Sequence, residues 1–285
     1  MLNILFLVVI LMTIVILWVM LYDSCRFVVI SHEIRDRRIC GHYRVVFLSD
    51  LHNKQYGKNN VRLLEAIEEI QPDAVLVGGD MINGKPGEKL EQAVNLLRAL
   101  QEKYSIYYAN GNHEHRIKLY PQTYGDEAER YAAALTELGI VPMVNTHVQL
   151  PGVNLAIYGS EIDKYYYKRF VTPKMDPEYL PRLLGSPDPS VYTILLAHNP
   201  DYFPQYAGWG ADLVLSGHVH GGIVRIPFWG KGLLHPGVRF FPKYDGGVYR
   251  EGDSTMILSR GLGIHTIPFR LFNPGEVIVI DFRGQ

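Results

Sequence analysis

The sequence contains little cysteine and no excess of charge of either sign. Only Cys25 and Cys40 occur among its 285 residues, both near the N-terminus. A framework of disulfides is therefore not indicated, and a zinc site of several thiolates is excluded by number. The formal net charge is −1, so we expect no nucleic-acid partner on electrostatic grounds. With 47% hydrophobic residues, the composition is that of an ordinary globular protein.

Charged side chains are absent from residues 1–22, where only Asn3 and Thr13 are clearly polar. A helix of this length can cross a hydrocarbon core about 30 Å thick. A cleaved signal peptide is the alternative, but no basic residue precedes the apolar run and no small-residue cleavage site follows it. We therefore expect residues 1–22 to form a single, retained transmembrane helix in the cell membrane.

Basic residues follow this run and do not precede it; they are Arg26, Arg35, Arg37 and Arg38. The positive-inside rule then predicts that the rest of the chain lies in the cytoplasm. We expect residues 23–42 to form a juxtamembrane segment, with a short strand at 26–30 as one option. Residues 43–285 are expected to form one folded domain.

From residue 43 onward, apolar runs of strand length alternate with amphipathic helical patterns. The first half predicts strands at 43–50, 73–80 and 105–114, and helices at 60–70, 88–104 and 126–138. The second half predicts strands at 154–163, 191–200, 211–222, 254–263 and 275–282, and helices only near 176–184 and 200–206. This order favours an α/β fold of two packed sheets with helices outside.

Histidine, carboxylate and amide side chains recur where these apolar runs end. In open α/β sheets, ligand sites collect beyond the carboxyl ends of the strands. His218 and His220 stand two residues apart, so in an extended backbone they would point to one side and toward one point. A polar turn is the alternative for that pair alone. The full set of candidate metal ligands is Asp50, His52, Asp80, Asn112, His198, His218 and His220.

Seven ligands are more than one metal ion requires. Carboxylates can bridge two cations, and imidazole suits manganese, iron, zinc or cobalt. Two such cations about 3.5–4 Å apart can clamp a phosphoryl group and activate water near neutral pH. We therefore expect two divalent metal ions (Mn, Fe, Zn or Co) and hydrolysis of a phosphate ester or anhydride.

Five motifs occur in one order: D-x-H at 50–52, G-D at 79–80, G-N-H-E at 111–114, His198, and G-H-x-H at 217–220. In this order and context they resemble the calcineurin-like metallophosphoesterases. The resemblance implies a four-layer α/β/β/α sandwich of two mixed sheets. It also implies one metal site of Asp50, His52, Asp80 and His220, and a second of Asp80, Asn112, His198 and His218, bridged by Asp80. His113 would be catalytic, either as a general acid or by stabilising charge on the leaving group.

The N-terminal apolar run, together with "AHNP", "GHVHGG" and "SRGLGIHTIPFR", resembles a bacterial membrane-associated branch of this superfamily. Some members of that branch are similar to UDP-2,3-diacylglucosamine pyrophosphatases. The resemblance implies a phosphodiester or pyrophosphate substrate near the bilayer, such as a lipid-linked nucleotide sugar. Two alternatives stay open: a phosphodiesterase on a soluble substrate such as a cyclic nucleotide, and a metal-binding scaffold without turnover.

Several further residues have both a functional and a structural interpretation. Asn83 could orient Asp80 or form a turn, and Arg116 could contact phosphate or lie at the surface. Arg260 and His265 could reach the rim of the site. The aromatic stretches at 165–167 and around Trp229 could cap the substrate or contact the membrane, where tyrosine and tryptophan are favoured, or they could pack in the core.

Overall fold

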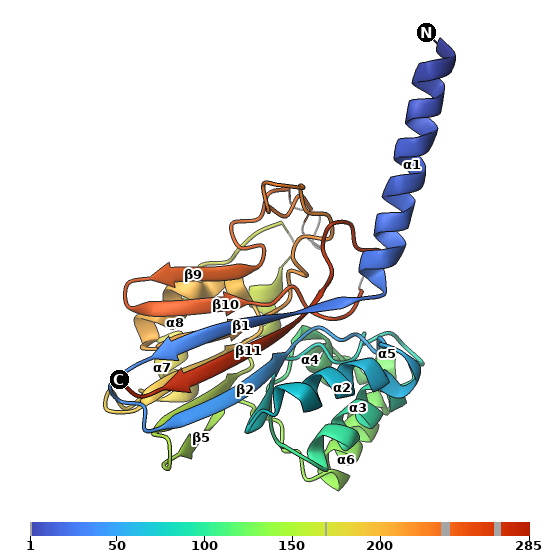
Figure 1. Cartoon of the computed structure of the whole chain (residues 1–285). Coiled ribbons are helices and arrows are strands. Elements are labelled where there is room, and N and C mark those ends of the chain that lie inside the picture. The colour runs from blue at the N-terminus through green and yellow to red at the C-terminus, as the bar shows by residue number, and fades with distance from the viewer. Residues whose placement is uncertain (1, 169, 235–239, 265–268) are drawn as a thin grey trace.

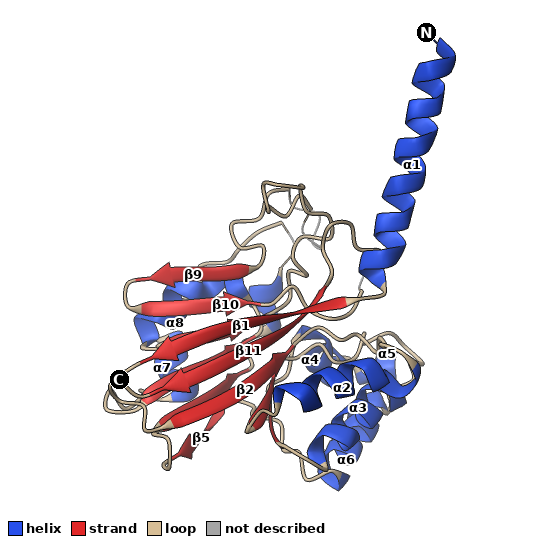
Figure 2. Cartoon of the chain, in the orientation of Figure 1, coloured by secondary structure: helices blue, strands red, loops and turns tan. Residues whose placement is uncertain are grey.

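Two mixed β-sheets lie face to face in the computed structural model, which describes residues 2–168, 170–234, 240–264 and 269–285. Helices cover the outer sides of the sheets, and one long helix, α1 (Leu2–Ser24), projects away from them (Figure 1, Figure 2). The four-layer α/β/β/α sandwich predicted from the sequence, preceded by one apolar helix, is thus confirmed.

The first sheet has the strand order β1-β11-β2-β3-β4. Its strands are β1 (Phe27–Arg35), β2 (His42–Leu48), β3 (Ala74–Val77), β4 (Ser105–Tyr108) and β11 (Gly275–Arg283). Strands β2, β3 and β4 are parallel to one another, so their carboxyl ends lie at one edge. Its outer face is covered by α2 (Val61–Ile70), α3 (Glu91–Gln101) and α6 (Glu127–Glu137), whose apolar stripes pack on the sheet.

The second sheet has the strand order β5-β6-β7-β8-β10-β9. Its strands are β5 (Thr146–Leu150), β6 (Leu155–Ser160), β7 (Tyr192–Ala197), β8 (Leu213–Ser216), β9 (Gly247–Glu251) and β10 (Ser254–Leu258). Helices α7 (Tyr179–Leu184) and α8 (Phe203–Trp209) cover its outer face. Strands β6, β7 and β8 are parallel, so this sheet also gathers carboxyl ends at one edge.

The main core lies between the two sheets. Phe47, Leu76 and Ile280 of the first sheet meet Ile194 and Leu215 of the second, and all five are fully buried. The central strands are buried on both faces, which is why they appear in the sequence as continuous apolar runs and do not alternate. This rigid sandwich holds the loops at the carboxyl ends of its strands in place.

Strand β1 ties the segment after α1 into the first sheet. It is longer than the short strand considered at 26–30, and it pairs in parallel with β11 from Phe27↔Gly275 to Arg35↔Arg283. Within the expected juxtamembrane segment, 23–42, residues 27–35 therefore form a sheet strand. The division of the chain at residue 43 stays a prediction about domain organisation.

The G-N-H-E motif does not end a strand as predicted. Strand β4 ends at Tyr108, and the motif begins helix α4 (Asn112–Leu119), which is followed by α5 (Pro121–Tyr124). The reason is local: the Glu114 carboxylate accepts a hydrogen bond from the N–H of Gly111 at 2.9 Å, which caps the first turn. Three short 3₁₀ turns complete the described elements, at Lys58–Asn60, Lys164–Tyr167 and Pro200–Tyr202.

Candidate metal centre

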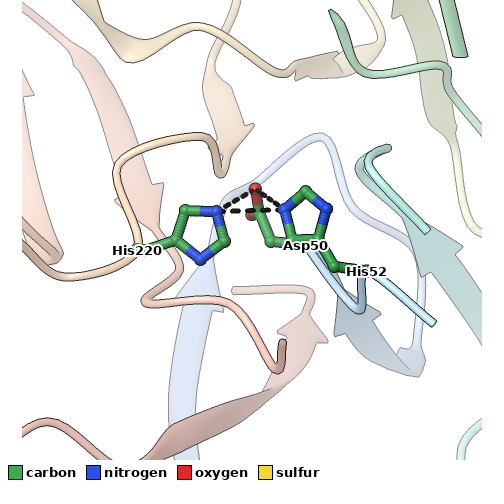
Figure 3. A group of neighbouring side chains, drawn as sticks. All are labelled: Asp50, His52 and His220. Atoms are coloured by element: carbon green, nitrogen blue, oxygen red, sulfur yellow. Dashed lines mark hydrogen bonds and ion pairs between the residues drawn. The ribbon is translucent and has the colours of Figure 1, made fainter. Parts of the chain in front are cut away.

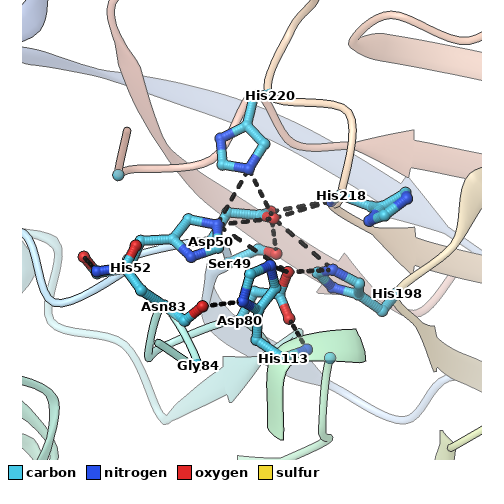
Figure 4. A network of polar contacts seen from close by, with 12 residues as sticks. Ser49, Asp50, His52, Asp80, Asn83, Gly84, His113, His198, His218 and His220 are labelled. Atoms are coloured by element: carbon cyan, nitrogen blue, oxygen red, sulfur yellow. Dashed lines mark hydrogen bonds and ion pairs between the residues drawn. The ribbon is translucent and has the colours of Figure 1, made fainter. Parts of the chain in front are cut away.

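The predicted ligands come together beyond the carboxyl ends of the strands. Asp50 and His52 follow β2, Asp80 follows β3, His198 follows β7, and His218 and His220 follow β8 (Figure 4). Asn112 and His113 form the first turn of α4. Parallel strands from both sheets therefore deliver side chains that are far apart in sequence to one buried cluster.

The first group of side chains consists of Asp50, His52 and His220 (Figure 3). Asp50 Oδ1 lies 3.4 Å from His220 Nε2 and 3.9 Å from His52 Nε2. The two imidazole Nε2 atoms are 3.1 Å apart. One carboxylate oxygen and two ring nitrogens thus face a common point, as the ligands of a metal ion do.

The second group consists of Asp80, His198 and His218. Asp80 Oδ2 lies 3.0 Å from His198 Nε2 and 4.0 Å from His52 Nε2. The ring of His218 lies edge-on to that of His198, with centroids 5.3 Å apart. Because His52 belongs to the first group, Asp80 stands between the two groups, in the position that a bridging carboxylate requires.

His113 belongs to a third, overlapping group with His52 and Asp80. Its Nε2 lies 3.7 Å from Asp80 Oδ2, and its Nδ1 contacts the carbonyl oxygen of Asn83. Nδ1 also lies 2.9 Å from Nη2 of the Arg116 guanidinium, and Nε2 faces the cluster. The resemblance implies that His113 acts on the leaving group and does not bind metal. Its Nε2 lies close enough to Asp80 that the geometry is compatible with binding metal as well as with acting on the leaving group.

Backbone carbonyls orient two of the other rings in the same way. Nδ1 of His52 is 3.1 Å from the carbonyl oxygen of Ile82, and Nδ1 of His198 is 2.7 Å from that of Gly78. Both contacts fix the hydrogen on Nδ1, so each Nε2 presents a lone pair to the centre of the cluster. This arrangement is typical of histidines that bind metal ions.

Buried polar atoms test whether the cluster fits metal ions. Seven buried side-chain nitrogen or oxygen atoms of the described residues make no hydrogen bond, and Asn112 Oδ1 and His198 Nε2 are two of them. Nε2 of His198 also lies 3.0 Å from Asp80 Oδ2, close enough for an ion pair. Buried polar atoms nearly always have partners. Two of these seven atoms belong to the predicted ligand set, so Asn112 and His198 fit a metal centre.

The charges of the cluster lead to the same conclusion. Burial raises the pKa of Asp50, and Asp80 adds to this effect while His198 opposes it. Burial acts on Asp80 in the same direction, but His113 and His198 lower its pKa well below the ordinary value. Although burial disfavours a charged ring, Asp80 and Asp50 raise the pKa of His198 to about 10. Two buried carboxylates thus favour positive charge beside them, which the histidines supply here and which bound cations would also supply.

Five of these residues hold an unusual backbone conformation. Asp50, His52, Asp80, His218 and His220 all have positive φ, between 48° and 72°. Non-glycine residues rarely adopt this region, and it concentrates at functional sites. The prediction that His218 and His220 share one side of an extended strand is therefore wrong. Strand β8 ends at Ser216, and the turn after it directs the two rings into two neighbouring groups.

The buried carboxylate of Glu114, which no sequence pattern had singled out, supports these turns. Glu114 accepts hydrogen bonds from the backbone N–H groups of Asp80 at 2.9 Å and Met81 at 2.8 Å, besides that of Gly111. Burial and the nearby Asp80 raise its pKa to about 7. The signal that could have found it is its place in the third position of a helix, where a carboxylate caps the first turn.

Close approach explains one glycine of the G-H-x-H motif. A Cβ at Gly217 would overlap Ser49 Oγ and Asp50 Oδ2. Ser49 donates to Asp50 Oδ2 at 2.6 Å, and the N–H of His218 donates to Asp50 Oδ1 at 3.0 Å. Only glycine leaves room for the carboxylate of Asp50 beside this turn.

Asn83 and Arg116 contact other groups than the Asp80 side chain and the phosphate predicted from the sequence. Asn83 donates to His52 O at 3.0 Å and accepts from His113, so it orients these two histidines and not Asp80. Arg116 donates to Asn83 O at 3.1 Å and Gly84 O at 2.8 Å, which makes it a support of that loop.

Arg260 and Tyr167 differ in whether they contact a residue of the cluster. Arg260 forms an ion pair with Glu276 at 2.9 Å. The ring of Tyr167 lies edge-on to that of His218, with centroids 5.3 Å apart, so it borders the second group. His265 lies outside the described residues.

Comparisons with known proteins agree with this geometry. The chain is 28% identical over 245 residues to the uncharacterized metallophosphoesterase YkuE of Bacillus subtilis (strain 168), covering 85% of this chain and 79% of that protein. It is 31% identical over 240 residues to an uncharacterized metallophosphoesterase of Helicobacter pylori (strain J99 / ATCC 700824), covering 82% of this chain and 58% of that protein.

An animal protein is similar as well. The transmembrane protein with metallophosphoesterase domain of Danio rerio is 27% identical over 254 residues, which cover 84% of this chain and 53% of that protein. The chain therefore spans little more than half the length of two of these three relatives. The model of one family, calcineurin-like phosphoesterase, matches residues 43–222 and so includes every residue of the cluster. On these grounds the chain belongs to the calcineurin-like phosphoesterase family.

Proposed function

We propose that this chain is a membrane-anchored hydrolase that uses two divalent metal ions to cleave a phosphodiester or pyrophosphate bond in a lipid-linked substrate. The observation that supports it best is the convergence of two carboxylates and four ring nitrogens on two adjoining points. One ion would be held by Asp50, His52, Asp80 and His220, and the other by Asp80, Asn112, His198 and His218. When bound, such ions supply positive charge to the phosphoryl oxygens and make an attacking water more acidic.

The chain's own residues have three tasks in this proposal. The burial of the cluster side chains limits the access of water and strengthens the electrostatic interactions among them. Asp50 and Asp80 hold the positive charge in place. The ring of His113 contacts Asn83 O and Arg116 through Nδ1, and its Nε2 faces the cluster, 3.7 Å from Asp80 Oδ2. In its protonated form the ring would donate a proton from Nε2 to the departing oxygen.

The membrane part of the proposal is supported by α1. Residues Asn3–Ser24 form a helix that is long and apolar enough to cross a membrane, and its side chains from Ile4 to Leu17 are exposed. Burying them in a bilayer removes this apolar surface from water. The arginines at 26, 35, 37 and 38 favour a cytoplasmic location for the catalytic domain. A substrate with a lipid tail would then be presented near the metal centre.

The test uses the full chain in nanodiscs with bis-p-nitrophenyl phosphate and Mn²⁺. We expect metal-dependent hydrolysis, and loss of at least about 100-fold in activity in Asp80→Ala and His218→Ala. His147→Ala is the matched control, since His147 is exposed and stacks on Tyr158 away from the cluster, so it should keep its activity. Inactivity of the wild type with two metal ions bound would indicate a scaffold and overturn the proposal.

A substrate panel tests the second part of the proposal. We expect lipid-linked nucleotide pyrophosphates in the nanodisc to be hydrolysed with a higher kcat/KM than soluble cyclic nucleotides. The opposite order would leave the phosphoesterase in place but refute the lipid-linked substrate, and would favour the soluble phosphodiesterase.

A further inference from the structure

A loop rich in exposed aromatic side chains follows the metal-centre histidines. We call residues 223–234 and 240–244 the aromatic loop. Phe228 is fully exposed, and Trp229, Phe240 and Phe241 are 66%, 68% and 57% exposed. The rings of Trp229 and Phe241 lie 6.4 Å apart, so part of this surface is contiguous. Large exposed apolar patches on a folded domain mark interaction surfaces.

The charge around these rings indicates what kind of partner they meet. The sequence from 213 to 244 contains no aspartate or glutamate, whereas it includes Lys231 and Lys243. Lysine is depleted in the apolar centre of protein–protein interfaces. Aromatic rings flanked by lysine are instead typical of segments that lie in the headgroup region of an anionic bilayer. The chemistry therefore favours a lipid surface over a protein partner.

Contacts fix the aromatic loop to the end of the membrane helix. The backbone N–H of Arg225 donates to Leu271 O at 3.0 Å, and Leu271 N–H donates to Ile223 O at 3.3 Å. The preceding residue, Arg270, donates its N–H to Ser24 Oγ at 3.0 Å. The 270–273 segment thus joins the loop to the last residue of α1.

Asn273 also connects the end of α1 to the metal centre. Asn273 donates its N–H to the buried carboxylate of Asp23 at 3.1 Å and its side-chain amide to His220 O at 2.7 Å. Asp23 also pairs with Arg26 at 2.9 Å. The end of α1, the aromatic loop and one candidate metal ligand are therefore held as one unit.

Aromatic and basic side chains near the end of α1 indicate where the bilayer surface would lie. Trp18 stacks on Tyr22 with centroids 5.4 Å apart, and the Arg26 guanidinium lies 4.6 Å over the Tyr22 ring. Tryptophan and tyrosine next to an arginine are typical of the membrane–water interface. In Figure 1 the orange loops that lead to β9 extend toward the same side of the domain as α1, whereas α6 and β5 lie at the opposite end.

We propose that the aromatic loop inserts Phe228, Trp229 and Phe241 into the headgroup region of the anionic membrane that α1 crosses. The loop begins three residues after His220, so docking would hold the metal centre next to the lipid headgroups. The proposal rests on the membrane anchoring proposed above, and adds to it a second contact that fixes how the domain faces the bilayer.

Tryptophan fluorescence of the full chain in nanodiscs of phosphatidylcholine and phosphatidylglycerol tests this contact. The chain has three tryptophans: Trp18 in α1, Trp229 in the loop, and Trp209, which is buried in α8 and donates to Gly185 O. The emission lost in Trp18→Phe reports Trp18, and the further loss in Trp18→Phe/Trp229→Phe reports Trp229. We expect the Trp229 signal to lose most of its intensity when the lipids carry a nitroxide quencher at carbon 5, while the Trp209 signal persists.

A matched control places a tryptophan on the far side of the domain. Val141, 79% exposed in the connection from α6 to β5, is replaced in Val141→Trp on the double-phenylalanine background, and we expect no quenching there. If Trp18 is quenched and Trp229 is not, the docking proposal is overturned and the anchoring stands. If neither is quenched, both are overturned. Hydrolysis of bis-p-nitrophenyl phosphate in the same nanodiscs reports the catalytic proposal separately.

Discussion

His113 and Asp80 contact each other at both ends of the aspartate carboxylate. The backbone N–H of His113 donates to Asp80 Oδ1 at 2.8 Å, and the ring Nε2 lies 3.7 Å from Oδ2. The first contact comes from the N-terminal turn of α4, where the helix dipole also favours negative charge. One oxygen is thus held by the backbone, and the other is left for the ring nitrogens around it. In the proposed metal centre, this division would leave Oδ2 of Asp80 for both ligand groups.

Removal of metal ions should lower the thermal stability of the protein. The buried Asp50 and Asp80 charges are best balanced by bound cations, and a ligand at 100 times its Kd stabilises the folded state by about 2.7 kcal/mol. For a domain of this size we expect a Tm about 5–10 °C lower after chelation, restored by Mn²⁺. Asp80→Asn should abolish this response, as differential scanning fluorimetry of the detergent-solubilised chain can show. An equal response in the variant would contradict the proposed bridging role.

Glu114 is expected to be a positioning residue that also stabilises the fold. In Glu114→Gln an amide N–H₂ group replaces one of the oxygens that accept from backbone N–H groups. Two hydrogen-bond donors then point at each other, and the backbone N–H loses its acceptor. We expect the free energy of unfolding to fall by about 2–3 kcal/mol, together with a lower kcat. The control is Glu68→Gln, which breaks only the exposed ion pair with Lys103 and should cost less than about 1 kcal/mol. Equal losses in both variants, measured by chemical denaturation, would refute the assigned role.

Gly217→Ala should impair activity through steric displacement of Asp50. The added methyl group has no space beside Ser49 Oγ and Asp50 Oδ2, so the carboxylate must move. We expect loss of at least about 10-fold in activity and weaker metal binding, because misplaced groups in a metal site are costly. Gly208→Ala, within α8 and with open space around it, should stay active and folded. Normal metal affinity in Gly217→Ala, measured by calorimetry, would show that this turn is more adaptable than the geometry implies.

Tyr167 should affect substrate binding through its ring. The ring borders His218, and an edge-on aromatic contact contributes about 0.5–1.5 kcal/mol. We expect Tyr167→Ala to raise KM about three- to ten-fold at unchanged metal content, whereas Tyr167→Phe keeps the wild-type KM. Tyr165→Ala serves as the comparison, since Tyr165 is 49% exposed. A KM in Tyr167→Ala no different from that in Tyr165→Ala would argue against this contact.

The sequence predicted the layers and the candidate cluster because both depend on strong local signals. Continuous apolar runs such as Ala74–Val77, bounded by turn residues, favour a central strand, and polar residues that follow such strands are expected at the edge of the sheet. Backbone turns were harder to foresee. His218 and His220 adopt positive φ because the pocket around them requires it, and no pattern of two histidines encodes that.

Long-range pairing was the other feature beyond local signals. Strand β1 has a half-exposed, alternating pattern, and its partner β11 lies roughly 250 residues later in the chain. Strand β9 is exposed on most of its residues and is held by its pairing with β10. Glu114 was overlooked because its importance arises from three backbone N–H groups that only the folded chain brings together.

The pairing of β1 with β11 also has a consequence for how the protein is made. A ribosome releases Phe27–Arg35 long before Gly275–Arg283, so β1 stays unpaired with β11 for most of synthesis. Any shortened version that removes α1 for solubility should keep Phe27 and the residues after it. A cut at residue 43 would expose the edge of β11 and invite aggregation.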